Sequence, residues 1–202
     1  MTDPIDEYKR RYQLFMKTVA GNLQAHVTGF LTETSNIERV TARAKEPARF
    51  EEKAYGVDEQ GQPKYKTPLT EIQDQFGVRV IVFYREDVNT VIGIITRYFQ
   101  PIEQRELVPE SEWAFGYFGQ HLVLPLPRDV VPQGVELKNV PKFFELQIKT
   151  LFQHAWSEAN HDLGYKTRSP LSTDQKRRLA YTSAQAWGAD RVFDELRSEI
   201  YK

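Results

Sequence analysis

Cysteine is missing from this chain of 202 residues, and so are long apolar runs. Without a thiol the chain has no disulfide framework, no cysteine-bound zinc or iron–sulfur cluster and no thiol nucleophile. No apolar run approaches the roughly 18 residues that a membrane-spanning helix requires, and the first residues lack the basic and then apolar pattern of a signal peptide. We therefore expect a cytoplasmic protein that does not associate with membranes.

A net excess of charge is lacking too, because 27 Lys and Arg residues are balanced by 28 Asp and Glu residues. The formal net charge of −1 excludes a generally basic nucleic-acid binder and a protein with a long acidic tail. Hydrophobic residues make up 40% of the chain, as in an ordinary globular protein. The length predicts a single domain over residues 1–202.

The spacing of apolar residues predicts helices at both ends and strands between them. A nearly continuous β-branched run at 78–84 indicates a strand buried on both faces, and 121–126 and 143–150 are two further strands. Polar segments at 56–68 and 100–113 are expected loops. This order predicts an α/β (α+β) fold, with a mixed central sheet flanked by helices from both termini. The expected helices cover 6–31, 47–55, 70–75, 86–99, 151–163 and 173–200.

Four clusters of polar residues carry the chemistry. Lys and Arg grouped before a central strand suit a polyphosphate, because each cation neutralises charged oxygens. A carboxylate before that strand, Asp74, is a plausible ligand of Mg²⁺, and a second one on a neighbouring strand, Glu145, could be a ligand or a general base. Glycines beside an exposed Tyr117 suit a loop on which a base stacks. The clusters are Arg43-x-Lys45-x-x-x-Arg49-x-x-x-Lys53, Asp74-x-x-Gly77-x-Arg79, Gly116-Tyr117-Phe118-Gly119-Gln120-His121, and Glu145-x-Gln147-Ile148-Lys149-Thr150 with the run Ala155 to Lys166 after it.

Each cluster also has an ordinary structural interpretation. The cations could form a solvated helix face, Asp74 could cap a turn, Tyr117 could belong to the core, and Glu145, Gln147 and Lys149 could be the wet face of a half-exposed strand. Only the combination, in a fixed order along the chain, favours phosphoryl-type transfer.

In that combination the chain resembles the synthetase domain of the RelA/SpoT family, in its small, single-domain alarmone synthetase form. The resemblance covers about residues 39–166, the expected catalytic core, and leaves helical segments at 1–35 and 170–202. It implies a nucleotidyltransferase-like sheet of about five strands. It also implies a GTP/GDP pyrophosphokinase, which moves the β,γ-pyrophosphate of ATP onto the ribose 3′-hydroxyl of GDP or GTP and makes the alarmone (p)ppGpp of the stringent response.

The resemblance also implies roles for individual residues. Arg43 and Arg79 would sandwich the adenine of ATP, and Lys45 and Lys53 would hold its phosphates. Arg49 is also expected to bind ATP. Asp74 would bind Mg²⁺, and Glu145 would activate the acceptor hydroxyl or share the metal. The acceptor side would consist of Tyr117 stacked on the base, with His121, Gln147, Lys149 and Lys166 beside it.

Three positions depart from the family pattern. Arg49 stands where the family has Ser, Gly119 replaces the Ser of the tyrosine loop, and Lys149 replaces Arg and with it the bidentate geometry of a guanidinium. The expected site nevertheless gathers seven cations (Arg43, Lys45, Arg49, Lys53, Arg79, Lys149 and Lys166) around two carboxylates, inside a chain of net charge −1.

Alternatives stay open at this point. A toxic branch of the family uses another acceptor, the 3′ end of tRNA or an adenine nucleotide, and such a member could have an antitoxin partner. A metal-dependent hydrolase is a minor alternative, because none of the four histidines (His26, His121, His154 and His161) has the H-x-x-x-H-D spacing. A binding module without turnover is disfavoured by the intact Asp74 and Glu145. The terminal helices permit a homo-oligomer such as a tetramer.

Overall fold

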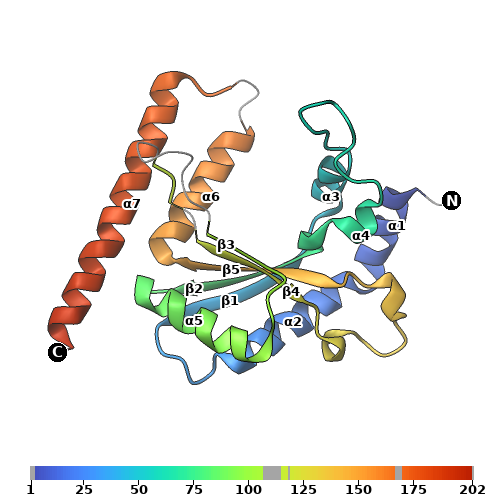
Figure 1. Cartoon of the computed structure of the whole chain (residues 1–202), viewed down its shortest axis with the longest axis horizontal. Helices are drawn as coiled ribbons and strands as arrows, with labels where there is room; N and C mark the ends of the chain where they lie inside the picture. The colour runs from blue at the N-terminus through green and yellow to red at the C-terminus, as the bar shows by residue number, and fades with distance from the viewer. Residues whose placement is uncertain (1–2, 107–114, 118, 167–169, 202) are drawn as a thin grey trace.

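The computed structural model describes residues 3–106, 115–117, 119–166 and 170–201 (Figure 1). Its centre is a five-stranded sheet of strand order β1-β2-β5-β4-β3. β2 and β5 are parallel, and the other neighbours are antiparallel, so the sheet is mixed as the sequence predicts. The strands are β1 (Ile37–Ala44), β2 (Phe76–Val82), β3 (Glu103–Glu106), β4 (Gln120–Pro125) and β5 (Phe143–Thr150).

Two of these strands were not expected. The sequence of β1 indicates only a basic stretch, because polar residues such as Glu38, Arg39 and Arg43 interrupt the alternation of apolar and polar positions that is typical of a strand. β3 is four polar residues long and lies inside the segment expected to be a loop. Both are edge strands, where side chains reach solvent and the apolar signal of a strand is weak.

The helices agree with the predicted positions. Helical structure near the N-terminus is continuous but contains a π-helical turn, η1 (Tyr12–Met16), between α1 (Pro4–Arg11) and α2 (Lys17–Phe30). The remaining α-helices are α3 (Pro47–Ala54), α4 (Pro68–Glu71), α5 (Arg85–Tyr98), α6 (Leu151–Lys166) and α7 (Thr173–Ile200), and short 3-10 turns cover Gln73–Gln75 (η2), Arg128–Val130 (η3) and Leu137–Asn139 (η4).

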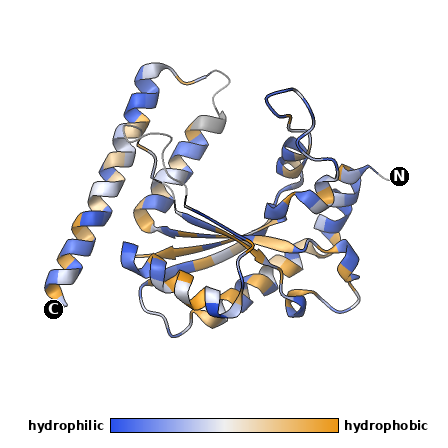
Figure 2. Cartoon of the chain, in the orientation of Figure 1, coloured by the Kyte–Doolittle hydropathy of each residue, from blue (hydrophilic) through white to orange (hydrophobic). Residues whose placement is uncertain are grey.

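The sheet has one apolar face and one polar face. On the apolar face Val78, Val80, Leu122, Leu146 and Ile148 are buried under α2 and α5 (Figures 1 and 2). Burying each such side chain contributes about 1.5–3 kcal/mol to folding. The opposite face is open between α3 and α4 on one side and α6 on the other (Figure 1). Since side chains alternate along a strand, the same strands that build the core present polar residues to this open face.

The two terminal helices differ in what they bury. The N-terminal helical segment inserts Tyr8, Met16 and Leu23 fully into the core. α7 packs against α6 and α5, but its buried residues are only Ser183 and Asp190. The expected apolar stripe of α7 therefore stays largely exposed, and Ile200 is 70% accessible. In the described parts of the chain, no helix combines the length and apolar character that crossing a membrane requires.

Candidate active site

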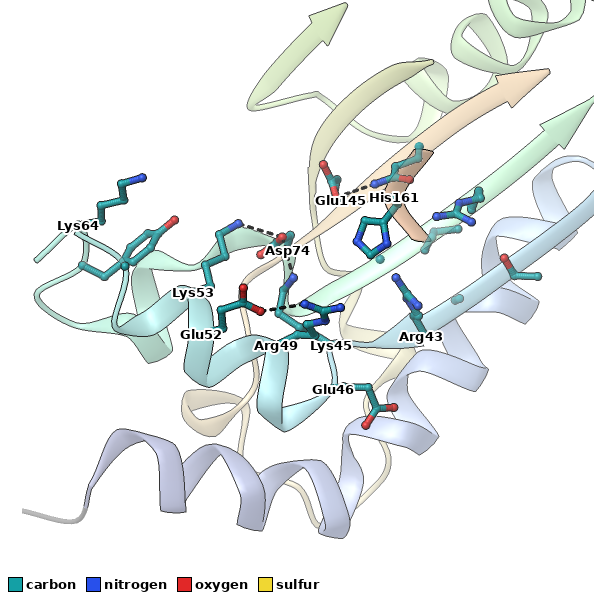
Figure 3. A pocket seen from close by; sticks show the side chains of 18 residues that line it. Arg43, Lys45, Glu46, Arg49, Glu52, Lys53, Lys64, Asp74, Glu145 and His161 are labelled. Carbon is teal, nitrogen blue, oxygen red and sulfur yellow. Dashed lines mark hydrogen bonds and ion pairs between the residues drawn. The ribbon is translucent and has the colours of Figure 1, made fainter. Parts of the chain in front are cut away.

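The polar face of the sheet forms the floor of a cavity of about 810 Å³. It contains most of the donor-side residues singled out in the sequence, together with Glu145 and Gln147 (Figure 3). The lining residues come from β1, α3, the loop after α3, η2, β2, β5 and α6. They are Thr41, Ala42, Arg43, Lys45, Glu46, Arg49, Glu52, Lys53, Gly56, Lys64, Tyr65, Asp74, Gly77, Val78, Arg79, Glu145, Gln147 and His161.

Strand register places the two arginines on this floor. Arg43 of β1 lies opposite Gly77 of β2, and Thr41 lies opposite Arg79, so both arginines project from the same face. Gly77 has no side chain, and a Cβ built there meets nothing within 4 Å, which leaves the space between the arginines clear. The side chain of Arg79 is directed toward α6, where its Nη1 lies 2.9 Å from Glu158 and 3.4 Å from His154 Nδ1.

Asp74 forms ion pairs with two lysines. Its Oδ2 accepts from Lys45 Nζ at 3.0 Å and from Lys53 Nζ at 2.9 Å (Figure 3). Burial acts to raise the pKa of Asp74, but the two ammonium groups outweigh it and hold that pKa below its usual value. The carboxylate is therefore ionised at neutral pH, with Oδ2 shared by two cations.

Helix α1 contacts the short segment between β1 and α3 that contains Lys45. Tyr8 donates its hydroxyl to the Lys45 carbonyl at 2.7 Å, and its ring stacks on Phe50 of α3 with centroids 3.7 Å apart. Both aromatic residues are fully buried. This packing fixes β1 relative to α3, which is where Lys45 and Lys53 must converge on Asp74.

Glu145 is the second carboxylate of the cavity. Its Oε1 lies 2.8 Å from His121 Nδ1, and its Oε2 accepts from Gln147 Nε2 at 3.1 Å. Pairing of β4 with β5 sets this arrangement, because His121 lies opposite Gln147. Burial acts to raise the pKa of Glu145, yet the contacts with His121 and Gln147 lower it overall.

The carboxylates fit a divalent cation of the kind that binds polyphosphates. In residues 3–106, 115–117, 119–166 and 170–201 no group of three His, Asp or Glu side chains is placed to hold a metal. Mg²⁺, however, takes only one or two carboxylates and completes its octahedron with water and phosphate oxygens. Asp74 Oδ1 is buried and has no hydrogen-bond partner among the described residues, which leaves one oxygen of the ionised carboxylate for such a ligand.

Lys64 and Tyr65 are among the cavity residues that the sequence analysis does not single out. Both belong to the loop after α3. The loop folds back because Val57 bridges Pro63 and the Lys64 amide donates to the Gly56 carbonyl at 2.9 Å. A polar segment rich in Gly and Pro indicates a turn but not its direction, so the sequence held no signal for this contact.

The expectation of an exposed Tyr117 is wrong. Its side chain is only 7% accessible, and its hydroxyl donates to Asp190 of α7 at 2.5 Å. The residue does not belong to the cavity lining. The physical reason is the C-terminal helix, which supplies a buried acceptor 73 residues further along the chain.

Lys149 is also withdrawn from the cavity. It is 6% accessible, and its Nζ donates to Ser157 Oγ of α6 at 3.0 Å. Burial, followed by the charge of Arg79, lowers the pKa of Lys149 to about 8. The expectation of a basic wall made by Lys149 is thus not met in this structure, and the side chain of Lys166 lies outside the described residues.

Comparisons with known proteins give one consistent family. The sequence pattern of the "region found in RelA / SpoT proteins" matches residues 42–170. GTP pyrophosphokinase YjbM from Bacillus subtilis (strain 168) is 31% identical over 171 residues, which cover 82% of this chain and 74% of that protein.

Solved structures share the fold over nearly the whole chain. Small alarmone synthetase 1 from Bacillus subtilis, bound to its product pppGpp, matches with a TM-score of 0.76 and 24% identity over 96% of this chain and 98% of that one. A GTP pyrophosphokinase family protein from Streptococcus pneumoniae matches with a TM-score of 0.71 and 26% identity, over 97% of this chain and 92% of that one.

Proposed function

The chain belongs to the RelA/SpoT family, and we propose that its cavity moves the β,γ-pyrophosphate of ATP onto the ribose 3′-hydroxyl of GDP or GTP. The protein is a GTP pyrophosphokinase that makes (p)ppGpp. One observation carries the proposal: a carboxylate held between two lysines, Asp74, lines the same cavity as a second carboxylate, Glu145. Phosphoryl-type transfer needs little else than positioning and charge neutralisation.

We assign the donor nucleotide to the side of the cavity built by β1, α3 and β2. The clear floor between Arg43 and Arg79 suits a flat base, since guanidinium groups stack on aromatic rings. Lys45, Lys53 and Arg49 line the adjoining wall, where they would neutralise phosphate oxygens. Mg²⁺ would supply further charge neutralisation when bound, with Asp74 Oδ1 as its ligand and Glu145 as a second one.

We assign the role of proton acceptor to Glu145. In the reaction, the 3′-oxygen attacks the β-phosphorus of ATP, the bond from that phosphorus to the oxygen bridging the α-phosphate breaks, and AMP leaves with the electron pair. The hydroxyl proton passes to the Glu145 carboxylate, which is ionised and is oriented by His121 and Gln147.

Acceptor choice is tested by offering γ-labelled ATP and Mg²⁺ with GDP, GTP, adenine nucleotides and tRNA in parallel. We expect label on GDP or GTP. Label on tRNA, together with growth arrest on expression, would instead assign the chain to the toxic branch and call for a search for an antitoxin. Label on AMP, ADP or ATP would assign it to synthesis of adenosine alarmones, and hydrolysis of ppGpp with Mn²⁺ would support the hydrolase alternative.

Assembly into a homo-oligomer such as a tetramer remains a proposal. It is supported by the apolar side chains that α7 leaves exposed, among them Val192, Phe193, Leu196 and Ile200, because large exposed apolar patches mark association surfaces. Light scattering across a concentration series tests it, and a monomer at every concentration would contradict it.

A further inference from the structure

Asp190 is a buried carboxylate for which the donor–acceptor chemistry above has no use. It is 1% accessible, although it lies on a helix that is otherwise largely exposed. Its Oδ2 accepts from the Tyr117 hydroxyl at 2.5 Å and from Thr150 Oγ1 at 2.6 Å, while its Oδ1 has no partner among the described residues. No lysine or arginine forms an ion pair with it in the part of the chain that the structure describes, and burial raises its pKa. Burying a carboxylate with two hydroxyl partners and no opposite charge lowers the free energy of unfolding, which favours a functional role for Asp190.

Both partners of Asp190 belong to the polar clusters on the acceptor side. Tyr117 lies just before β4, the strand that brings His121 to Glu145. Thr150 ends β5, the strand that carries Glu145 and Gln147. Asp190 therefore connects α7 to both strands that form the acceptor side of the cavity.

Gly119 shows how closely this segment lies against β5. A Cβ at position 119 would be 2.3 Å from the Ile148 carbonyl oxygen and 2.5 Å from Lys149 Cγ, distances that real Cβ atoms do not adopt. The glycine, at the position where the family pattern has Ser, thus permits a backbone approach that a serine would prevent. The close approach helps to keep Lys149 buried, while Tyr117 is turned away from the cavity toward α7.

We propose that Asp190 is a positioning residue that holds the acceptor segment, residues 116–117 and 119–121, in a withdrawn state, and that acceptor binding requires release of the Tyr117–Asp190 hydrogen bond. The proposal rests on the proposed function and on the role that the family resemblance implies for Tyr117, which is to stack on the acceptor base. Only part of the population is competent for GDP or GTP, so the apparent acceptor affinity is reduced by the competent fraction. The donor side needs no such change, because its residues already line the cavity.

Tyr117→Phe is the primary test, because it keeps the ring and removes only the hydroxyl. We expect the KM for GDP to fall about tenfold while the KM for ATP stays the same, since a hydrogen bond to a buried carboxylate favours the withdrawn state by an amount of this order. Asp190→Ala should lower the KM for GDP similarly, and Asp190→Asn, which keeps an acceptor oxygen, should lie closer to the wild type. In the double variant Tyr117→Phe/Asp190→Ala the two effects should not add.

Glu195→Gln is the matched control, because it also neutralises an acidic side chain of α7. Glu195 is exposed, and its nearest ion-pair contact is Arg191 of the same helix, at 3.7 Å. This variant should leave the KM for GDP unchanged. A KM for GDP that is unchanged or raised in Tyr117→Phe would overturn the proposal, because the hydroxyl would then serve the bound acceptor or nothing.

Hydrogen exchange gives a readout that needs no turnover. We expect amides of residues 116–117 and 119–121 to exchange about tenfold faster in Tyr117→Phe and Asp190→Ala than in the wild type or Glu195→Gln. Unchanged exchange in both variants would overturn the proposal even where activity is normal. If the wild-type protein transfers no label to GDP or GTP, the proposed function fails, while faster exchange in the same two variants still supports the positioning role. Circular dichroism checks that each variant is folded.

Discussion

The donor and acceptor sides of the cavity differ in how far they are assembled. On the donor side, Lys45 and Lys53 already meet at Asp74 and line an open cavity. On the acceptor side, Tyr117 and Lys149 are both buried and bonded to other elements, α7 and α6. The donor cations lie on or beside β1 and α3, which the N-terminal helix fixes. The Tyr117 side chain is instead held by its hydrogen bond to Asp190 of α7.

This contrast suggests that the two substrates bind in different ways within one site. In the proposed assignment, a polyphosphate donor would meet charges that are already in place and would need no rearrangement of the chain. An acceptor nucleotide must first obtain its contacts, which allows acceptor choice to depend on a conformational equilibrium. The departures Gly119 and Lys149 both fall on this second side, and each stabilises the withdrawn arrangement or results from it.

The strongest test of the donor side is removal of its central carboxylate. Asp74→Ala should lower transfer at least about a hundredfold with every acceptor, because both lysines and the expected metal lose their shared partner. Glu145→Ala should abolish transfer as well. Circular dichroism should show a persistent fold, and Glu59→Gln, on an exposed loop position, is the charge control. Substantial activity in either alanine variant would show that its assigned role is wrong.

Close packing on the acceptor side is tested by adding one methyl group. Gly119→Ala should lower the free energy of unfolding by about 2 kcal/mol, because the Cβ collides with the backbone of Ile148. Gly93→Ala on α5 is the matched control, since a Cβ there meets nothing within 4 Å. In a helix that change should be neutral or stabilising. Equal melting temperatures for the two variants would argue against the close approach.

Removal of the Tyr117 ring should separate the two substrates. Relative to Tyr117→Phe, which lacks the same hydroxyl, Tyr117→Ala is expected to raise the KM for GDP about tenfold, the usual effect of losing one base–aromatic stack, while the KM for ATP stays nearly the same. Steady-state kinetics with each substrate varied in turn measures both values. An equal loss for ATP and GDP would contradict an acceptor role for the ring.

The smallest effect concerns the buried ammonium group of Lys149. Its pKa is about 8 in the folded protein, against 10.5 for an ordinary lysine. Between these values the unfolded chain binds more protons than the folded one, so stability rises with pH over this range. The melting temperature of the wild type relative to Lys149→Gln should therefore increase from pH 7.5 to pH 9.5. A difference that is constant with pH would show that Lys149 titrates normally.

Sequence patterns captured the donor side better than the acceptor side. The order of the polar clusters along the chain and the resemblance to the family assign Arg43, Lys45, Asp74 and Arg79 to one site, although β1 itself was not predicted. β1 escaped detection, since its core-facing positions include the small Ala42. The burial of Tyr117 could not be inferred because its acceptor, Asp190, is distant in sequence and lies on a helix whose pattern gives no sign of a buried carboxylate.

The same limit applies to Lys149. Alternation along β5 correctly indicated that its side chain shares a face with Glu145 and Gln147. The burial of Lys149 at the end of that face depends on how α6 packs on the sheet, and on Ser157 Oγ, which accepts a hydrogen bond from the ammonium group. The periodicity of apolar residues along β5 carries no information about which helix packs over Lys149.

The π-helical turn at Tyr12–Met16 makes the structure sensitive to insertion or deletion of a residue between α1 and α2. Each residue added to or removed from a helix rotates everything beyond it by about 100°. The turn sets the phase of α1 relative to α2, and through it the direction in which Tyr8 reaches the Lys45 carbonyl. Deleting one residue there would restore an uninterrupted α-helix yet swing Tyr8 away from Phe50. The positions of Lys45 and Lys53 in the cavity therefore depend on the number of residues in the π-helical turn at Tyr12–Met16.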